Sequence, residues 1–163
     1  SYADLSERVG IRKASIHHHF PTKEALGTAV IDCYLERFVV ELDALAGRSI
    51  DVRRKLSVYG DFFAKGLQEG QMPLCGALAG DAAYLPAAMQ ERVKVFFEVH
   101  LGWLEKVVAQ GIAAGEIDGR LSPKTYALLL LSTLQGASVV AWALKDASVV
   151  KPTYRQALER LAA

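Results

Sequence analysis

The stretch from Asp4 to Leu26, DLSERVGIRKASIHHHFPTKEAL, constrains the fold most, because one glycine and one proline divide it into short pieces. Gly10 tolerates a positive φ, so it predicts a tight turn after a first helix over residues 2–9. Pro21 disfavours helical backbone at the residue before it, so a second helix over residues 12–18 must end there. The sequence therefore predicts two short helices joined by a tight turn.

The apolar residues of this stretch recur at spacings that allow them to meet in one small core. They are Leu5, Val9, Ile11, Ile16 and Phe20. Lys, Arg, Ser and His fill the positions between them. This layout is typical of a helix-turn-helix, whose second helix enters the major groove of DNA. From spacing alone, a merely solvated polar helix face remains an equal alternative.

The rest of the chain is also periodic in the manner of helices, and no segment alternates for long enough to form a strand. Apolar stripes and cap residues predict six further helices, and glycine or proline ends most of them. Their expected ranges are residues 23–46, 52–69, 75–84, 87–115, 123–145 and 152 to the end of the chain. We therefore expect an all-α fold.

Composition and missing motifs exclude several classes of protein. Hydrophobic residues make up 52% of the chain, so much of it must pack against something. The longest apolar stretch, residues 126–142, contains Ser132, Thr133 and Gln135, so we predict no transmembrane helix. The net charge is +1, so a nucleic-acid surface must be local. There is no signal-peptide pattern, nucleophile elbow, phosphate loop or HExxH sequence, so nothing favours an enzyme.

Two cysteines and four histidines give no pattern of a metal site. Cys33 and Cys75 are far apart, which predicts a reducing cytoplasm and neither a disulfide framework nor zinc. Neighbouring helix residues point about 100° apart, so His17, His18 and His19 cannot converge on one ion. We expect no metal and no cofactor. We expect Cys33 in the core, and His19 with Phe20 closing the N-terminal core.

The residues from Gly10 to Leu26 resemble, in order, the DNA-binding signature of the tetracycline-repressor (TetR) family. The matching residues are Gly10, Ile11, Lys13, Ser15, His18, His19, Phe20, Pro21, Thr22, Lys23, Glu24 and Leu26. The resemblance implies an all-α, homodimeric, ligand-responsive transcriptional regulator, and we expect a repressor. It implies a DNA-binding domain with its linking helix over residues 1–46, and an effector-binding and dimerisation domain over residues 47–163.

The sequence departs from the family pattern in three ways. The family has another helix before this stretch, so we expect that the sequence is truncated or represents only part of a longer chain. His17 stands where tyrosine is common, and Arg12 stands where Ser or Thr usually caps the recognition helix. We expect the last two differences to change base preference without abolishing DNA binding.

The second helix is the predicted base-contacting helix, with double-stranded operator DNA as its partner. Arg12 and Lys13 can reach base edges or phosphates, because Arg or Lys to guanine is the commonest specific contact. Contacts to phosphates position a protein on DNA without specifying sequence. The residues expected to make them are Ser15, His17, His18 and Lys23.

Aromatic and polar side chains after residue 52 are the candidates for an effector site, since pockets in helical bundles are mostly apolar with few polar groups. They are Tyr59, Phe62, Phe63, Cys75, Asp81, Phe96, His100, Trp103, Gln135 and Trp142. Each has the plainer alternative of an ordinary core residue. Cys75, near an expected helix start, is either a reactive sensor with a lowered pKa or a small buried apolar residue.

The segment LLLLSTLQGASVVAWAL, residues 128–144, is apolar nearly all round, so the helix must be buried on both sides. A seam between two copies of the chain explains this best. Its expected contact residues are Leu130, Leu134, Ala137, Ala141 and Leu158.

The alternative function is an α-helical module that binds small molecules or proteins and no longer binds DNA.

Overall fold

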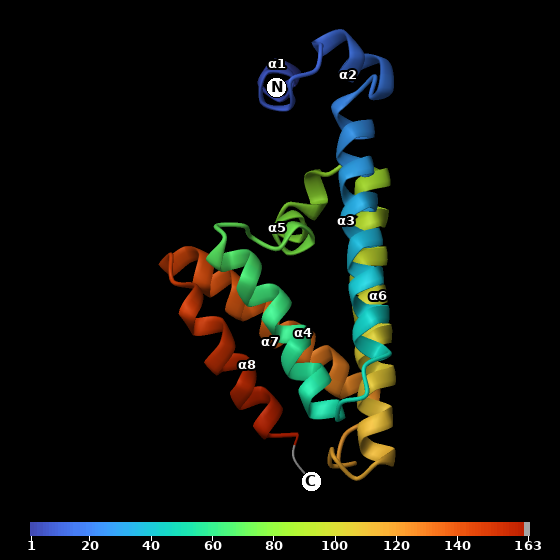
Figure 1. Cartoon of the computed structure of the whole chain (residues 1–163), viewed down its shortest axis with the longest axis vertical. Coiled ribbons are helices and arrows are strands. Elements are labelled where there is room, and N and C mark those ends of the chain that lie inside the picture. The colour runs from blue at the N-terminus through green and yellow to red at the C-terminus, as the bar shows by residue number, and fades with distance from the viewer. Residues whose placement is uncertain (162–163) are drawn as a thin grey trace.

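The computed structural model describes residues 1–161, and all the regular elements of this part are helices (Figure 1). The α-helices are α1 (Tyr2–Val9), α2 (Lys13–His19), α3 (Lys23–Ala46), α4 (Val52–Gln68), α5 (Leu74–Gly80), α6 (Ala87–Ala113), α7 (Pro123–Leu144) and α8 (Val150–Glu159). Two 3-10 helices are η1 (Ala82–Tyr84) and η2 (Ala147–Val149). The predicted all-α fold is confirmed.

Most helix ends lie where cap and breaker residues predict them. Gly10 ends α1 with φ 75°, a left-handed conformation that suits glycine. The hydroxyl of Thr22 accepts a hydrogen bond from the Ala25 amide at 3.0 Å and so caps α3. Ser122 caps α7 in the same way, and Pro123 occupies the first helical position, where no amide partner is needed.

Two predicted ranges are wrong in detail. The single helix expected over residues 75–84 is α5 followed by a 3-10 turn, and the break comes just after Gly80, a weak helix former. The last helix begins at Val150 and not at Pro152, because proline is tolerated in the first turn of a helix. Residues 162 and 163, which the prediction also placed in this helix, lie outside the described residues.

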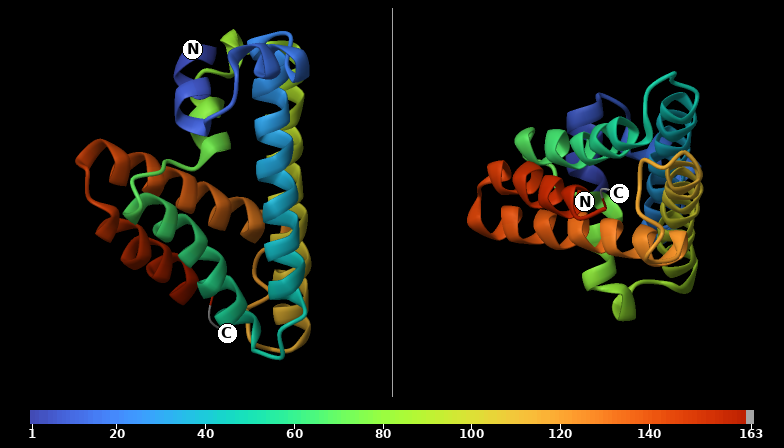
Figure 2. Two further views of the ribbon diagram at one scale, coloured as in Figure 1. Left: turned by 45° about the horizontal axis from the view of Figure 1, so that its top comes forward. Right: turned by 90° about the horizontal axis from the view of Figure 1, so that it is seen from below.

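The helices form two groups that meet at one end. Helices α3 and α6 lie side by side along the long axis, while α4, α7 and α8 form a second group that leaves them at an angle (Figures 1 and 2). Helices α1 and α2 stand at the far end of α3, away from the second group (Figure 1). The larger core lies among α3, α4, α6, α7 and α8, and a smaller one joins α3, α5 and α6.

The junction of α3, α4 and α6 is both aromatic and hydrogen-bonded. The hydroxyl of Tyr59 and Nδ1 of His100 are hydrogen-bonded at 2.6 Å, and both side chains are fully buried. The indole N–H of Trp103 donates to the carbonyl of Leu42 at 3.0 Å. The ring of Phe38 lies 4.8 Å from that of His100, centroid to centroid. Helix α3 is therefore fixed to α6 by a buried hydrogen bond and by ring packing.

The buried His100 makes stability depend on pH. Burial lowers the pKa of His100 from 6.5 to about 3, because the cationic form would lose its hydration. Below pH 6.5 this histidine binds a proton in the unfolded chain but stays neutral in the folded chain. Stability therefore falls as pH drops below 6.5. Between pH 8 and pH 5 we expect this residue to lower the free energy of unfolding by about 2 kcal/mol. His100→Gln, measured by urea unfolding at both values, should lose this share of the pH dependence; an unchanged dependence would contradict the burial argument.

Helices α4 and α8 pack closely at Gly60. A Cβ added to Gly60 would meet Cε1 of Tyr154 at 2.6 Å, whereas one added to Gly102 of α6 would meet nothing within 4 Å. We expect Gly60→Ala to lower the free energy of unfolding by about 1–3 kcal/mol, because overpacking strains a dense core. Gly102→Ala, the matched control, should leave it unchanged or raise it by up to about 1 kcal/mol. Equal effects in denaturant titrations would refute the close packing of α4 on α8.

Candidate functional site

The helix-turn-helix unit, formed by α1 and α2, is held together by Tyr2. Its hydroxyl donates to the carbonyl of Phe20 at 2.9 Å, and its ring meets that of His17 edge-on at 4.4 Å. Tyr2 and Ile16 are the buried residues of the two helices. In addition, the hydroxyl of Ser6 donates to the carbonyl of Ile11 at 2.5 Å across the turn. These contacts fix α2 relative to α1.

The predicted N-terminal core is wrong for three of its five residues. Leu5, Val9 and Ile11 are 37%, 63% and 46% exposed, because they lie on a face of α1 and the turn that no described helix covers. His19 is exposed as well, and only Ile16 is fully buried. Tyr2, which the sequence analysis did not select, takes their place in the core.

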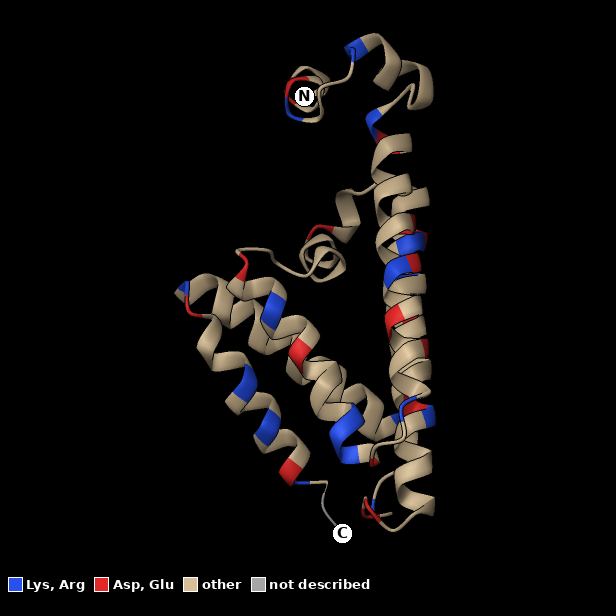
Figure 3. Cartoon of the chain, viewed as in Figure 1, with Lys and Arg blue, Asp and Glu red and all other residues tan. Residues whose placement is uncertain are grey.

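The predicted DNA contacts all lie on the surface of this unit. The exposed residues are Arg12, Lys13, Ser15, His17, His18 and Lys23. Helix α2 carries no acidic residue, and its positive charge stands at its start beside Arg12 (Figure 3). Lys23 begins α3, immediately after the turn at Pro21. The structure thus gives one polar, basic and accessible surface at the end of the molecule farthest from α7 and α8 (Figure 1).

The effector candidates do not all meet in one place. Tyr59, Phe63, Phe96, His100 and Trp103 meet in the aromatic junction of α3, α4 and α6. Asp81 is exposed beyond the end of α5, and Trp142 is 51% exposed on α7, so neither joins this group. Gln135 is half-buried, and its Oε1 lies against the backbone of Gly76 in α5.

A cavity of about 220 Å³ lies next to the aromatic junction. It is lined by Tyr34, Phe38, Phe62, Phe63, Gly66, Gln71, Met72, Pro73 and Leu74. Of the predicted effector residues it contains only Phe62 and Phe63. Tyr34 and Phe38, which the sequence analysis did not select, border the cavity from α3. A larger hollow, of about 500 Å³, lies between the ends of α4 and α7 and includes Trp142.

Several buried polar atoms of the body have no hydrogen-bond partner within the described structure. They are Nε2 of His100, both amide atoms of Gln135, Oγ of Ser138 and the hydroxyl of Tyr154. Such atoms are few in native proteins, and water or a ligand usually satisfies them. Three of these four residues lie on α6 and α7, so the buried polar atoms without a partner gather on these two helices.

Cys75 does not have the properties of a reactive thiol. The side chain is fully buried beside Ile31, Val93 and Phe96, and burial raises its pKa to about 12. The sequence analysis considered a pKa lowered by a helix N-terminus, but loss of hydration outweighs that effect here. Cys33, which we expected in the core, is exposed on α3. Of the two cysteines, the accessible one is therefore Cys33.

The residues that we predicted as dimer contacts on α7 face the core of the protomer and not the solvent. Leu130, Leu134, Ala137 and Ala141 are buried in the core of the protomer, and Leu158 of α8 is half-buried against it. The opposite face of α7 is exposed at Leu128, Leu129, Val139 and Val140, which are 46–55% accessible. By length and composition alone α7 could span a membrane, but its other side is packed on α4, α6 and α8.

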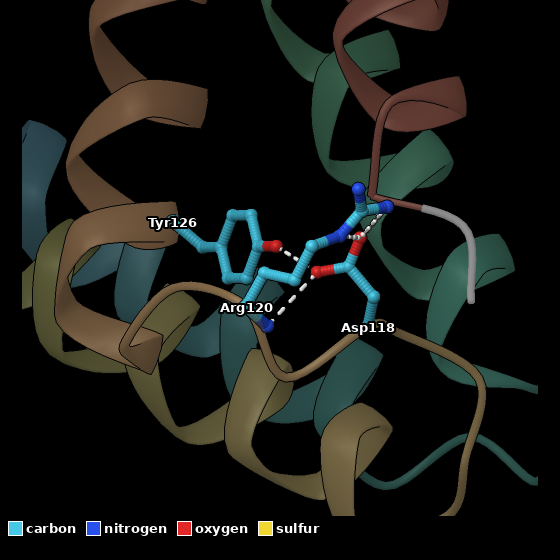
Figure 4. Close-up of polar contacts among 3 residues, drawn as sticks. All are labelled: Asp118, Arg120 and Tyr126. Atoms are coloured by element: carbon cyan, nitrogen blue, oxygen red, sulfur yellow. Dashed lines mark hydrogen bonds and ion pairs between the residues drawn. The ribbon is translucent and has the colours of Figure 1, made fainter.

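A polar cluster fixes the loop between α6 and α7 and has a structural role (Figure 4). Arg120 Nε donates to Asp118 Oδ2 at 2.9 Å, and the hydroxyl of Tyr126 donates to the other carboxylate oxygen. These donors lower the pKa of Asp118. The amide of Asp118 donates to the carbonyl of Leu161 at 3.0 Å, which ties the loop to the end of α8. Within residues 1–161, no group of three His, Cys, Asp or Glu side chains is placed to hold a metal ion.

Comparison with known proteins matches the helix-turn-helix part of the chain to a known family. Residues 1–30 match the family described as bacterial regulatory proteins, tetR family. A curated relative, the nucleoid occlusion factor SlmA of Marinobacter nauticus, is 29% identical over 126 residues. That match covers 77% of this chain and 62% of the relative, so the chain spans less than two thirds of its length.

Solved structures extend the likeness to the whole chain. A TetR-family transcriptional regulator from Agrobacterium tumefaciens is 31% identical, with a TM-score of 0.94 over 100% of this chain and 87% of that one. A TetR regulator from Legionella pneumophila is 27% identical, with a TM-score of 0.86 over 99% of this chain and 86% of that one. The helix-turn-helix unit and the body thus agree with one fold along their full length, and the chain belongs to the TetR family of transcriptional regulators.

Proposed function

We propose that this regulator is a cytoplasmic repressor, not an enzyme, that binds operator DNA as a homodimer and releases it when a small molecule binds the body. The observation that carries this proposal is the position of α3. One end of this helix carries the basic helix-turn-helix unit, and the other end is built into the core beside Trp103. A single helix therefore connects the DNA-contacting surface with the body.

The DNA-contacting surface has the parts that the proposed role needs. Arg12 and Lys13 project from the start of α2, where base edges come within reach when a recognition helix enters the major groove. Ser15, His17, His18 and Lys23 surround them and are placed for phosphates. We propose residues 1–46 as the DNA-binding domain with its linking helix, and residues 47–163 as the effector-binding and dimerisation domain.

The exposed face of α7 is the proposed dimer seam. Leu128 and Leu129 lie about three turns from Val139 and Val140 on this face, and Gly136 between the two pairs leaves room for a close approach of two helices. Exposed apolar faces of this kind favour association, because water is released from them. A two-fold axis at the seam would place two copies of α2 in successive major grooves, about 34–36 Å apart.

One observation favours a second function, a small-molecule or protein-binding module without DNA binding. Leu5, Val9 and Ile11 form an exposed apolar surface on the helix-turn-helix unit, and surfaces of this kind favour binding of a partner. The two functions differ in their first measurable property, since only the regulator selects a DNA sequence.

Substitutions in the helix-turn-helix unit test DNA binding. A preferred sequence is first selected from a random DNA pool with the unmodified chain. We then expect Arg12→Ala and Lys13→Ala to weaken its binding by about 1–3 kcal/mol and to relax base preference. Lys23→Ala should weaken binding to all sequences and reduce the salt dependence by about one phosphate contact. The control is Lys65→Ala on α4, and fluorescence anisotropy measures all four; failure to select any sequence would favour the second function.

Substitutions on α7 test the dimer. The double variant Leu129→Asp with Val140→Asp places two charges in the proposed seam, and burial of unpaired charges is costly. We expect this variant to run as a folded monomer in light-scattering chromatography, whereas the unmodified chain runs as a dimer. Val40→Asp, at an apolar residue of α3 that is 68% exposed, is the control and should remain a dimer. A dimer in all three samples would exclude this face.

A further inference from the structure

We propose that the 220 Å³ cavity between α3, α4 and residues 71–74 binds a neutral, planar aromatic compound of one or two rings. The proposal rests on the function proposed above, because it names the class of effector. It differs from that function in being testable without DNA.

The walls of the cavity favour an aromatic ligand. Four aromatic side chains line it, from Tyr34 and Phe38 on α3 and from Phe62 and Phe63 on α4. Phe38 meets Phe62 and Phe63 at centroid distances of 6.2 and 6.3 Å with the rings edge-on. Edges and faces of rings carry opposite partial charge, so such walls pair best with a further ring placed edge-to-face or offset.

The same walls disfavour a charged ligand. None of the residues that line the cavity carries a formal charge. Tyr34 is neutral at physiological pH, since burial raises its pKa to about 12. An ion that entered would lose hydration without gaining a counter-charge, which costs far more than the transfer of a neutral ring. Polar recognition is limited to neutral groups such as the Tyr34 hydroxyl.

The volume sets the size of the ligand. An apolar cavity of about 150 Å³ holds benzene. A cavity of about 220 Å³ therefore suits one ring with substituents or two fused rings, and larger ring systems exceed it.

The position of the cavity links occupancy to the helix-turn-helix unit. Helices α3 and α4 leave the turn at residues 47–51 at an angle, and the cavity lies between them (Figure 1). At 1.5 Å per residue, Tyr34 is roughly 18 Å from the end of α3 at this turn, and Lys23 is roughly 35 Å from it. Any change of the angle between α3 and α4 at this turn therefore displaces the helix-turn-helix unit about twice as far as it displaces Tyr34.

Three naphthalene compounds and two glycine variants test the site. The probes are 1-naphthol, which is neutral, 1-naphthoate and 1-naphthylmethylammonium, and calorimetry measures their binding to the full chain. We expect 1-naphthol to bind at least tenfold more tightly than either ion. Gly66→Leu places a side chain in the cavity and should weaken 1-naphthol at least tenfold. Gly102→Leu, on the α6 face away from this cavity, is the matched control and should change binding less than twofold.

A second variant keeps the test informative if Gly66→Leu does not fold. Phe62 is half-buried, and Phe62→Ala should enlarge the cavity enough to admit a three-ring neutral compound, 9-anthracenemethanol, that the unmodified chain excludes. Absence of 1-naphthol binding, equal binding of the ions, or no change in size preference in Phe62→Ala would each overturn the assigned site.

A label on α3 tests, without DNA, whether the bound ligand changes the position of this helix, as the proposed regulation requires. Cys33 is exposed on α3 and Cys75 is buried, so a nitroxide reagent should label Cys33 selectively. In the dimer, 1-naphthol should shift the distance between the two labels, measured by pulsed electron resonance, and should lower DNA affinity. A bound probe that leaves the label distance unchanged overturns the regulation through α3 proposed above and leaves the site standing. A shifted distance in a chain that selects no DNA overturns the proposed DNA binding and leaves the site standing.

Discussion

The hydrogen bond from the Trp103 indole to the Leu42 carbonyl fixes the one helix that belongs to both parts of the molecule. It lies in the core, where no water competes, and it joins α6 to α3 near the turn into α4. The ring of Phe38, one turn away, packs on His100, which is itself hydrogen-bonded to Tyr59 of α4. The three helices are therefore locked where they converge. Farther along α3 the contact with α4 gives way to the cavity, while α3 stays packed on α6.

Helix α7 has two apolar faces with different partners. Leu130, Leu134 and Ala137 fill the core of the protomer, whereas Leu129 and Val140 remain exposed. A rigid seam through the exposed face would hold α7 and α8 of two copies together, and the α3–α6 pair of each copy would extend from it. Any change of angle between α3 and α4 would then alter the separation of the two helix-turn-helix units. The proposed regulation requires a rigid seam at α7 and a variable angle between α3 and α4.

The sequence predicted what depends on neighbouring residues. Gly10, Pro21 and the Ser122–Pro123 pair act on the local backbone, and they place helix ends within a residue or two. The choice of buried face on α7 failed because leucine, valine and alanine occur all round this helix, and only its packing on α4, α6 and α8 decides between them. Of the two alternatives for Cys75, the sensor with a lowered pKa is wrong for the same reason, since the burial of the thiol comes from α3 and α6. The cavity was not foreseen, because residues 71–74 close it from far along the chain.

The net charge of +1 does not describe where charged groups lie in the molecule. Every resolved pKa shift in the interior, at Tyr34, Tyr59, Cys75, His100 and Tyr154, favours the neutral form of the group. Helix α2, in contrast, exposes Lys13 beside Arg12 with no acidic residue of its own. The surface around α2 therefore favours contact with a polyanion, whereas the interior favours neutral groups over ions. A neutral effector and an anionic operator would not compete for the same groups, so each can influence the other only through the position of α3.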